Sequence, residues 1–299
     1  MGKETEIGWC DSTFNPWWGC VRVSPGCEHC YAQSFTTRLG MDLWGPTAPR
    51  RFFGDKHWDE PLRWDAHART SGKPWRVFCA SMADICEDRE DLVPYRERLM
   101  SLVAHTRHLT WLFLTKRPED YLRLFGEGFF LANPHVWPGF TAENQAMLDK
   151  RASAVLELPG SGKKWMSVEP LLGPVSFRWA HWDDWKDGNG ARRQRVNHLD
   201  GLKKLDWVIV GGESGPGARP CDVAWIRSIV EQCKTAAVPV FVKQLGAKWF
   251  NRDIRQGIRG SVCVPVDESI PWIRIDQKDK KGGDPSEWPA DLRVREWPR

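Results

Sequence analysis

The stretch LTWLFLTKRP, residues 109–118, starts as a run of apolar residues and ends in polar ones. A short apolar run rich in bulky side chains is typical of a strand that is buried on both faces of a sheet. Thr115, Lys116 and Arg117 would mark the point where this strand leaves the core. The same form recurs in RVFCASMAD (76–84), HVWPGFTAEN (135–144), KWMSVEP (164–170), LDWVIVGGESG (205–215) and VPVFVKQLG (238–246).

Amphipathic segments alternate with these predicted strands. In residues 91–106 the apolar side chains share one face of a predicted helix, and residues 144–158 and 222–236 have the same periodicity. Alternation of strands and helices predicts a parallel sheet. With one more strand expected before the cysteine-rich loop at residues 15–33, we expect an α/β fold, as a full or partial (β/α) barrel of parallel strands. An open doubly wound sheet is the second interpretation, and both place a ligand site at the carboxyl ends of the strands.

The barrel is expected to occupy residues 1–250. Residues 40–75, rich in Trp, Arg, Pro and Gly, and residues 178–204 interrupt the strand–helix rhythm and predict insertions. Residues 251–299 contain helix-breaking residues and mixed charge, which predicts an irregular C-terminal arm.

Composition limits the class of protein. No apolar run reaches the roughly 18–20 residues that a membrane span needs, so no membrane partner is expected. The start MGKETEIGW lacks the apolar core of a signal peptide, which predicts a cytoplasmic location. The net charge of +4 permits nucleic-acid binding without requiring it. Most of the 19 tryptophans are expected to pack in the interior, and some are candidate stacking surfaces for bases.

The loop NPWWGCVRVSPGCEHCYAQ (15–33) carries Cys20, Cys27 and Cys30 with the spacing C-x6-C-x2-C. Soft thiolates select zinc, copper(I) or an iron–sulfur cluster. In one interpretation the three thiols hold a [4Fe–4S] cluster and leave one iron open to a ligand. In a second, Cys10 or His29 completes a four-ligand structural zinc site. In a third, the cysteines are unrelated small packing residues, although a Pro-Gly loop offers little core to fill.

The three-cysteine loop followed by Tyr31 and Ala32 resembles the radical S-adenosylmethionine superfamily, with a longer first gap than the usual C-x3-C-x2-C. The chain more closely resembles a family of phage and bacterial proteins that is allied to spore photoproduct lyase and is linked to enzymes that hypermodify thymine in viral DNA. The matching segments are NPWWGCVRVSPGCEHCYA, VFCASMADI, LTKRP, SVEPLLGP, WVIVGGESGPGARP and VKQLG.

This resemblance implies a [4Fe–4S] cluster on Cys20, Cys27 and Cys30, and reductive cleavage of S-adenosylmethionine to a 5′-deoxyadenosyl radical that abstracts a substrate hydrogen. Such enzymes hold S-adenosylmethionine at the strand ends. The corresponding positions here are Ser81, Asp84, Thr115, Lys116, Glu143, Glu169 and Glu213. Alternatively, each glutamate forms a structural ion pair, for example Glu169 with Lys116 or Lys243.

The implied reaction is an isomerisation or bond cleavage of a modified thymine base, in DNA or in a nucleotide, with a reducing electron donor as partner. The expected cellular setting is a bacterial or phage-infected cytoplasm. Cationic residues expected to contact nucleic acid are Arg117, Arg192, Arg193, Arg195 and Arg219. The alternative interpretation is a zinc-stabilised nucleic-acid-binding protein without catalysis.

Overall fold

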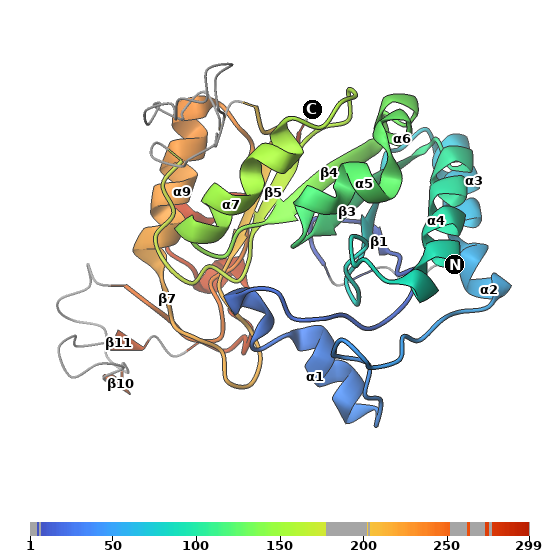
Figure 1. Ribbon diagram of the computed structural model, residues 1–299. Coiled ribbons are helices and arrows are strands. Elements are labelled where there is room, and N and C mark those ends of the chain that lie inside the picture. The colour runs from blue at the N-terminus through green and yellow to red at the C-terminus, as the bar shows by residue number, and fades with distance from the viewer. Residues whose placement is uncertain are drawn as a thin grey trace, which may run out of the picture. The chain divides into compact units, whose positions relative to one another are not determined.

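The computed structural model describes residues 5, 7–177, 202, 204–251, 262–263, 273–274 and 277–298 (Figure 1). The chain forms two compact units. The first unit contains Met1–Thr141 and Arg151–Trp165, and the second contains Ala142–Lys150 and Met166–Arg299.

Four parallel strands form the framework of the first unit, in the order β1-β2-β3-β4. Their bounds are Ser12–Thr13 (β1), Trp75–Cys79 (β2), Leu109–Thr115 (β3) and Val136–Thr141 (β4). The register places Ser12 beside Val77, Val77 beside Trp111, and Trp111 beside Val136. Because the strands are parallel, their carboxyl ends lie at one edge of the sheet.

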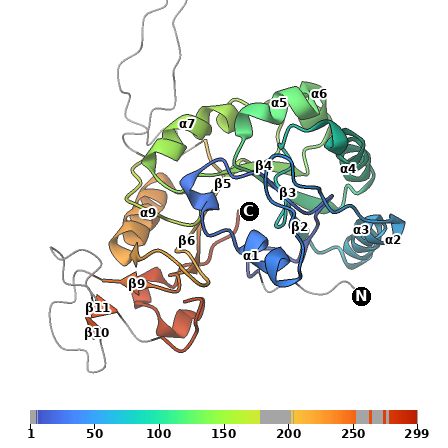
Figure 2. The same cartoon turned by 60° about the horizontal axis from the view of Figure 1, so that its bottom comes forward.

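Helices follow these strands along the chain. They are α1 (Tyr31–Arg38), α2 (Asp55–Trp58), α3 (Glu60–Ser71), α4 (Val93–His105), α5 (Tyr121–Phe125) and α6 (Glu127–Ala132), with single turns at Pro25–Cys27, Glu90–Leu92 and Pro118–Asp120. Helices α3 and α4 lie side by side (Figures 1 and 2). Gly72 ends α3 in the left-handed conformation, with φ of 66°, which glycine adopts without steric cost.

Aromatic side chains fill the interior of the first unit. Trp17, Trp111 and Trp165 are fully buried, and the Trp165 indole donates to the Trp137 carbonyl oxygen at 2.9 Å. Tyr121, which donates to the Gly139 carbonyl oxygen at 2.9 Å, packs against a group of rings from α5 and α6. The expectation that tryptophans serve mainly in packing is therefore confirmed for these buried residues.

The second unit has its own parallel strands, in the order β5-β6-β8, with bounds Trp165–Val168, Trp207–Gly211 and Val240–Gln244. Helix α7 (Gln145–Leu156) and strand β5 each run from one unit into the other. Helix α9 (Val223–Ala236) begins at Asp222, whose side chain accepts a hydrogen bond from the Ala224 amide at 2.9 Å. This cap satisfies one of the amides that a helix start leaves without an intrahelical partner.

A small second sheet and the chain end complete this unit. The sheet has the order β10-β11-β9-β7, with bounds Cys221–Asp222 (β7), Trp249–Phe250 (β9), Val262–Cys263 (β10) and Ile273–Arg274 (β11). After single turns at Pro285–Glu287 and Ala290–Leu292, the chain returns to β8, where Val242 donates to Val294 and Glu296 donates to Val240. Part of the expected C-terminal arm is thus paired to a strand.

The expected α/β class with parallel strands is confirmed in both units. The segment 40–75, expected to be an irregular insertion, contains α2 and α3. Most of the expected insertion near 178–204 lies outside the described residues. Among the helices that the structure describes, none combines the length and apolar character required to cross a bilayer.

Candidate functional site

The loop that carries the three cysteines crosses the carboxyl ends of strands in the first unit. It leaves β1 and passes the segment after β2, where the Gly19 amide donates to the Met82 carbonyl oxygen at 3.0 Å. On its other side, the Gly45 amide donates to the Cys20 carbonyl oxygen at 3.0 Å. Cys20 therefore sits between two backbone segments at the edge where β1 and β2 end.

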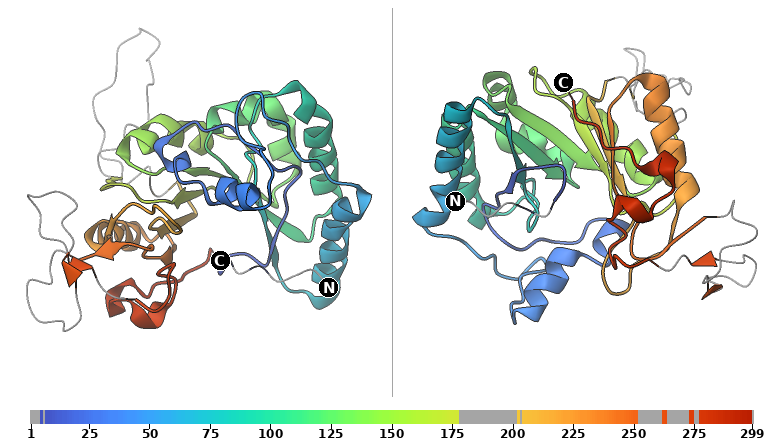
Figure 3. Two further views of the ribbon diagram at one scale, coloured as in Figure 1. Left: turned by 90° about the horizontal axis from the view of Figure 1, so that it is seen from below. Right: turned by 180° about the vertical axis from the view of Figure 1, so that it is seen from behind.

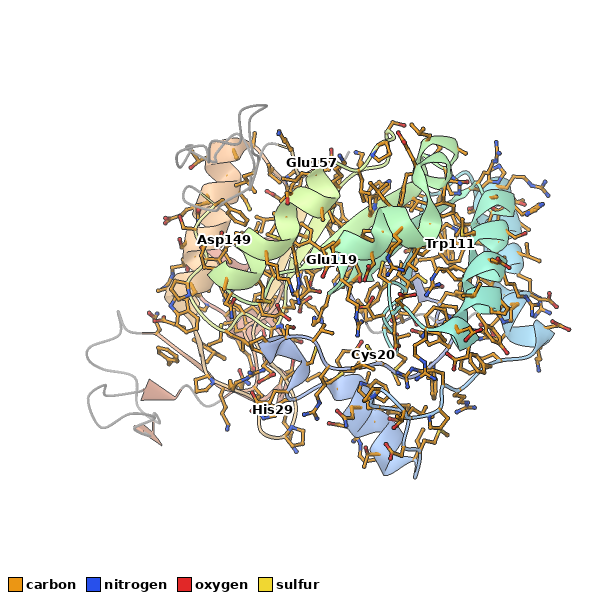
Figure 4. The ribbon with its side chains drawn as sticks, viewed as in Figure 1. Cys20, His29, Trp111, Glu119, Asp149 and Glu157 are labelled. Carbon is orange, nitrogen blue, oxygen red and sulfur yellow. The ribbon has the colours of Figure 1, made fainter. Side chains whose placement is uncertain are left out.

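The thiols of Cys20, Cys27 and Cys30 are all half-buried and free of disulfides. The Cys27 sulfur lies 3.7 Å from the Ser24 hydroxyl, and α1 begins directly after Cys30. Figure 4 shows Cys20 and His29 on the segment that leads into α1. Over the part of the chain that the structure describes, no three side chains of His, Cys, Asp or Glu are grouped as a metal site would require.

The donor chemistry of the three thiols suits an iron–sulfur cluster. Three soft, partly accessible thiols on one loop match such a group in donor chemistry. Their convergence on a common centre is not present in this structure, so the predicted ligand set stays a prediction. Neither proposed fourth zinc ligand, buried Cys10 or half-buried His29, joins the three thiols in a metal-type group within the described residues.

Asp84 organises the strand ends around it. Its carboxylate accepts hydrogen bonds from the Thr115 hydroxyl at 2.5 Å and from the Lys116 amide at 3.0 Å. It also pairs with Arg117, with Nη1 2.9 Å from Oδ2. Three of the predicted site residues, Asp84, Thr115 and Lys116, are thus brought together with Arg117 where β2 and β3 end.

Arg117 lies in the interior of this network, although the sequence suggested a nucleic-acid contact. Its side chain is 12% exposed. Its guanidinium donates to the Val21 carbonyl oxygen at 2.8 Å and approaches the Cys20 sulfur at 3.8 Å. The arginine therefore links the end of β3 to the cysteine loop.

The electrostatic setting of Cys20 follows from these contacts. Burial and then the negative charge of Asp84 raise the pKa of the Cys20 thiol to about 12, against the opposing effect of Arg117. The metal-free protein therefore carries a neutral thiol at this position. A bound cation would reverse this balance, because coordination deprotonates a thiol.

Ser81 belongs to a second set of contacts at the same strand ends. Asn15, just after β1, donates to the Ser81 hydroxyl at 3.1 Å and accepts from the Met82 amide at 2.7 Å. The Tyr31 hydroxyl donates to the Ser81 carbonyl oxygen at 2.6 Å. Sequence reasoning missed Asn15, although its place after the first strand was a usable signal.

A buried ion pair holds the backbone segment that is hydrogen-bonded to Cys20. Arg50 pairs through two contacts with Glu87, and both side chains are almost completely buried. Arg50 also donates to the carbonyl oxygens of Leu43 and Gly45, at 2.9 and 3.1 Å. Sequence reasoning missed this pair, since a single arginine in an irregular segment carries no local signal.

In the second unit, Glu169 follows β5 and pairs with Lys243 at the end of β8. Lys243 Nζ lies 3.0 Å from Glu169 Oε1, and the Ser167 hydroxyl lies 3.3 Å from Oε2. This is one of the two ion pairs considered as an alternative to a cofactor contact. An ammonium and a carboxylate at neighbouring strand ends are also the groups that bind a zwitterionic ligand.

Glu213 and Arg219, predicted as a cofactor contact and a nucleic-acid contact, bind each other. Glu213 accepts from the Arg219 amide at 2.8 Å, from its Nε at 2.9 Å and from its Nη2 at 2.7 Å.

Glu143 is fully buried, and its carbonyl oxygen accepts from the Leu172 amide at 2.8 Å. Arg192, Arg193 and Arg195 lie outside the described residues.

The geometry defines an α/β protein with a thiol-bearing loop and a charged network at the ends of parallel strands. By sequence the chain belongs to a protein family of unknown function (DUF5131), whose model matches residues 4–283. No curated protein and no solved structure is significantly similar to the chain.

Proposed function

We propose that this chain is a radical S-adenosylmethionine enzyme of the isomerase or lyase type on a partial (β/α) barrel. Its substrate would be a modified thymine base, in DNA or in a nucleotide. The observation that carries the proposal is the course of the cysteine loop across the carboxyl ends of β1, β2 and β3. That edge is where parallel α/β folds place their ligands.

Cys20, Cys27 and Cys30 would hold a [4Fe–4S] cluster, with S-adenosylmethionine beside it. When bound, these groups supply one-electron chemistry that begins with hydrogen abstraction from the substrate. The electron would come from an external reducing donor. The chain's own residues bind and orient these groups and keep bulk water away from them.

Arg117 is the positioning residue that the contacts support best. Its guanidinium reaches the Cys20 sulfur and the Val21 carbonyl oxygen, while Asp84 holds it from the other side. A cationic N–H donor beside a sulfur ligand stabilises the thiolate and tunes the centre that it holds. This contact gives the first cysteine a partner suited to its deprotonated form.

The first experiment measures iron and sulfide after anaerobic purification and reconstitution. We expect a brown protein with a broad band in the visible blue, and its loss in Cys20→Ala, Cys27→Ala or Cys30→Ala. Cys10→Ala is the matched control, because Cys10 is also a cysteine near the N-terminus outside any disulfide but is buried. Iron loss in the Cys10 variant, with retention in the other three, would contradict the ligand assignment.

The second experiment incubates the reconstituted protein with S-adenosylmethionine and dithionite without oxygen. Release of 5′-deoxyadenosine supports the proposal, and its absence in a protein with full iron content contradicts it. A colourless protein with one bound zinc would instead support the zinc-stabilised nucleic-acid-binding alternative. Comparing DNA that contains a modified thymine with the free nucleotide then tests the form of the substrate.

A further inference from the structure

Helix α1 carries an apolar surface that the first unit leaves uncovered. Tyr31, Phe35 and Leu39 follow at intervals of four residues and are 54%, 40% and 50% exposed. We call these three residues the α1 face. Side chains four apart lie on one side of a helix, one turn from each other. Figures 1 and 3 show α1 on the outside of the first unit.

The ring of Phe35 belongs to an aromatic group that continues inward. It meets Trp18 edge-on, with ring centroids 6.0 Å apart, and Trp18 in turn meets Phe53 at 5.5 Å. The Tyr31 ring is anchored at its far end, because its hydroxyl is bonded to Ser81. Both exposed rings are therefore held in place, which lowers the entropy lost when a planar ligand stacks on them.

Three arginines lie on α1 or on side chains that contact it. Arg22 donates to the Gln33 side chain at 2.7 Å, Arg38 donates to the Ser34 carbonyl oxygen at 3.3 Å, and the Arg51 guanidinium lies 4.7 Å from the Trp18 ring centroid. All three are exposed. Within the described ranges none of them pairs with a carboxylate. Their positive charges remain available to an anionic ligand.

We infer that the α1 face, with Arg22, Arg38 and Arg51, binds a single strand of nucleic acid. Bases would stack on Tyr31 and Phe35, and the arginines would neutralise phosphates. Exposed aromatic rings flanked by cations are the chemistry by which proteins hold single strands without reading sequence. In an acidic protein partner, the carboxylates would satisfy the arginines but would not exploit the two fixed rings by stacking.

The size and composition of α1 favour a short stretch of strand. Its eight residues rise by about 12 Å, enough for a few nucleotides. The sequence of the helix, YAQSFTTR, contains no acidic residue that would repel phosphate. Bases in a duplex are stacked on each other, so only an unpaired strand can offer them to side-chain rings.

The inference deepens the proposed function and rests on it for its biological role, because α1 begins directly after Cys30. A strand on α1 would approach the carboxyl ends of β1 and β2 through Tyr31 and Ser81. The binding itself needs neither the cluster nor S-adenosylmethionine. It can therefore be tested separately from catalysis.

The test measures the anisotropy of a fluorescein-labelled oligo(dT) during titration with the full chain. We expect Tyr31→Ala with Phe35→Ala to weaken binding by about tenfold or more, as loss of stacking predicts. Tyr31→Phe keeps the stacking ring and loses only its hydroxyl anchor, so it should weaken binding by less than the double alanine variant does. Leu122→Ala with Leu131→Ala, two other exposed apolar residues, is the matched control and should leave affinity unchanged.

A second pair of variants tests the charges. Arg22→Ser with Arg38→Ser should lower the slope of log affinity against log salt by about 1.4, since each single-strand phosphate contact contributes about 0.7. Arg63→Ser with Arg69→Ser removes the same charge from exposed positions on α3 and should leave the slope unchanged. Equal effects of the two pairs would show diffuse attraction and would overturn the inference.

Further binding results support or overturn the assignment of the α1 face to a single strand. Absence of oligo(dT) binding, or equal binding by the Tyr31–Phe35 variant, overturns the inference. It is likewise overturned if polyglutamate binds as tightly and is lost in the same variant, or if that variant converts a dimer into a monomer. Loss of strand binding in folded variants that retain iron supports the inference. Strand binding in a protein without iron supports it as well, while contradicting the proposed catalysis.

Discussion

Buried charges in the first unit are placed to hold backbone segments together. Arg50 joins Glu87 to the carbonyl oxygens of its own loop, and Arg117 joins Asp84 to the cysteine loop. Removing one partner of a buried pair leaves a charge without compensation, which costs far more than loss of an exposed pair. These two arginines are therefore structural supports of the proposed site.

Glu87→Gln should lower the free energy of unfolding by about 3–5 kcal/mol, because Arg50 stays buried without its carboxylate. The measurement is urea denaturation followed by tryptophan fluorescence. Asp55→Asn removes the acid from an exposed pair with Arg98 and should cost no more than about 1 kcal/mol. Equal losses in the two variants would show that burial does not govern the strength of the Arg50–Glu87 pair.

His135 predicts a dependence of stability on pH. Burial lowers the pKa of His135 below the ordinary histidine value of 6.5, while its Nε2 lies 2.9 Å from the Val103 carbonyl oxygen. The unfolded chain then binds a proton at a higher pH than the folded one. The contribution of His135 is present above about pH 6.5 and is lost as the pH falls through the lower folded value.

The check is urea denaturation between pH 8 and pH 5 for the parent and for His135→Gln. The difference in unfolding free energy between them should change in this window, with the parent losing more stability on acidification. Parallel pH profiles would contradict a lowered pKa for His135. His105, which is exposed, provides the control substitution His105→Gln.

At the scale of elements, β4 is built around close approach of its backbone to a tryptophan. A side-chain carbon on Gly139 would lie 2.5 Å from Trp165 Nε1 and 2.8 Å from the Phe113 carbonyl oxygen. Real carbon atoms do not approach this closely, and the second neighbour is backbone that cannot turn away. Gly139 thus allows Trp165 to pack across the strand.

Gly139→Ala should therefore destabilise the protein by about 1–3 kcal/mol, as overpacking of a full interior does. Gly128 in α6 offers the matched control, since a side-chain carbon there meets nothing within 4 Å. Gly128→Ala should be neutral or stabilise by about 0.5–1 kcal/mol, because alanine is the better helix residue. Thermal unfolding compares the two, and equal effects would contradict the packing argument.

At the scale of the whole molecule, the net charge of +4 favours the approach of DNA, and each phosphate contact that forms makes binding more sensitive to salt. The basic run at Arg192, Arg193 and Arg195 places three positive charges within four residues of the sequence. Replacing all three by serine should reduce the salt slope for single-stranded DNA by about 2 and leave iron content unchanged. Filter binding across a range of salt concentrations measures the slope.

The control removes the same charge elsewhere, with Lys278, Lys280 and Lys281 replaced by serine. These lysines are exposed in the C-terminal segment. An equal change of slope in the two triple variants would assign the effect to overall charge and would contradict a local contact by the arginine run.

The sequence by itself determined the alternation of strands and helices, and with it the edge where polar side chains gather. Strand and helix patterns are local, so the stretch LTWLFLTKRP predicts both β3 and the polar residues at its end. Only the tertiary structure decided how those residues are used. Arg117 pairs with Asp84 and contacts the Cys20 sulfur, and Glu213 pairs with Arg219. The physical reason is that a charge takes the partner nearest in space, and for Arg117 the fold supplies Asp84 and Cys20, which lie far from it along the chain.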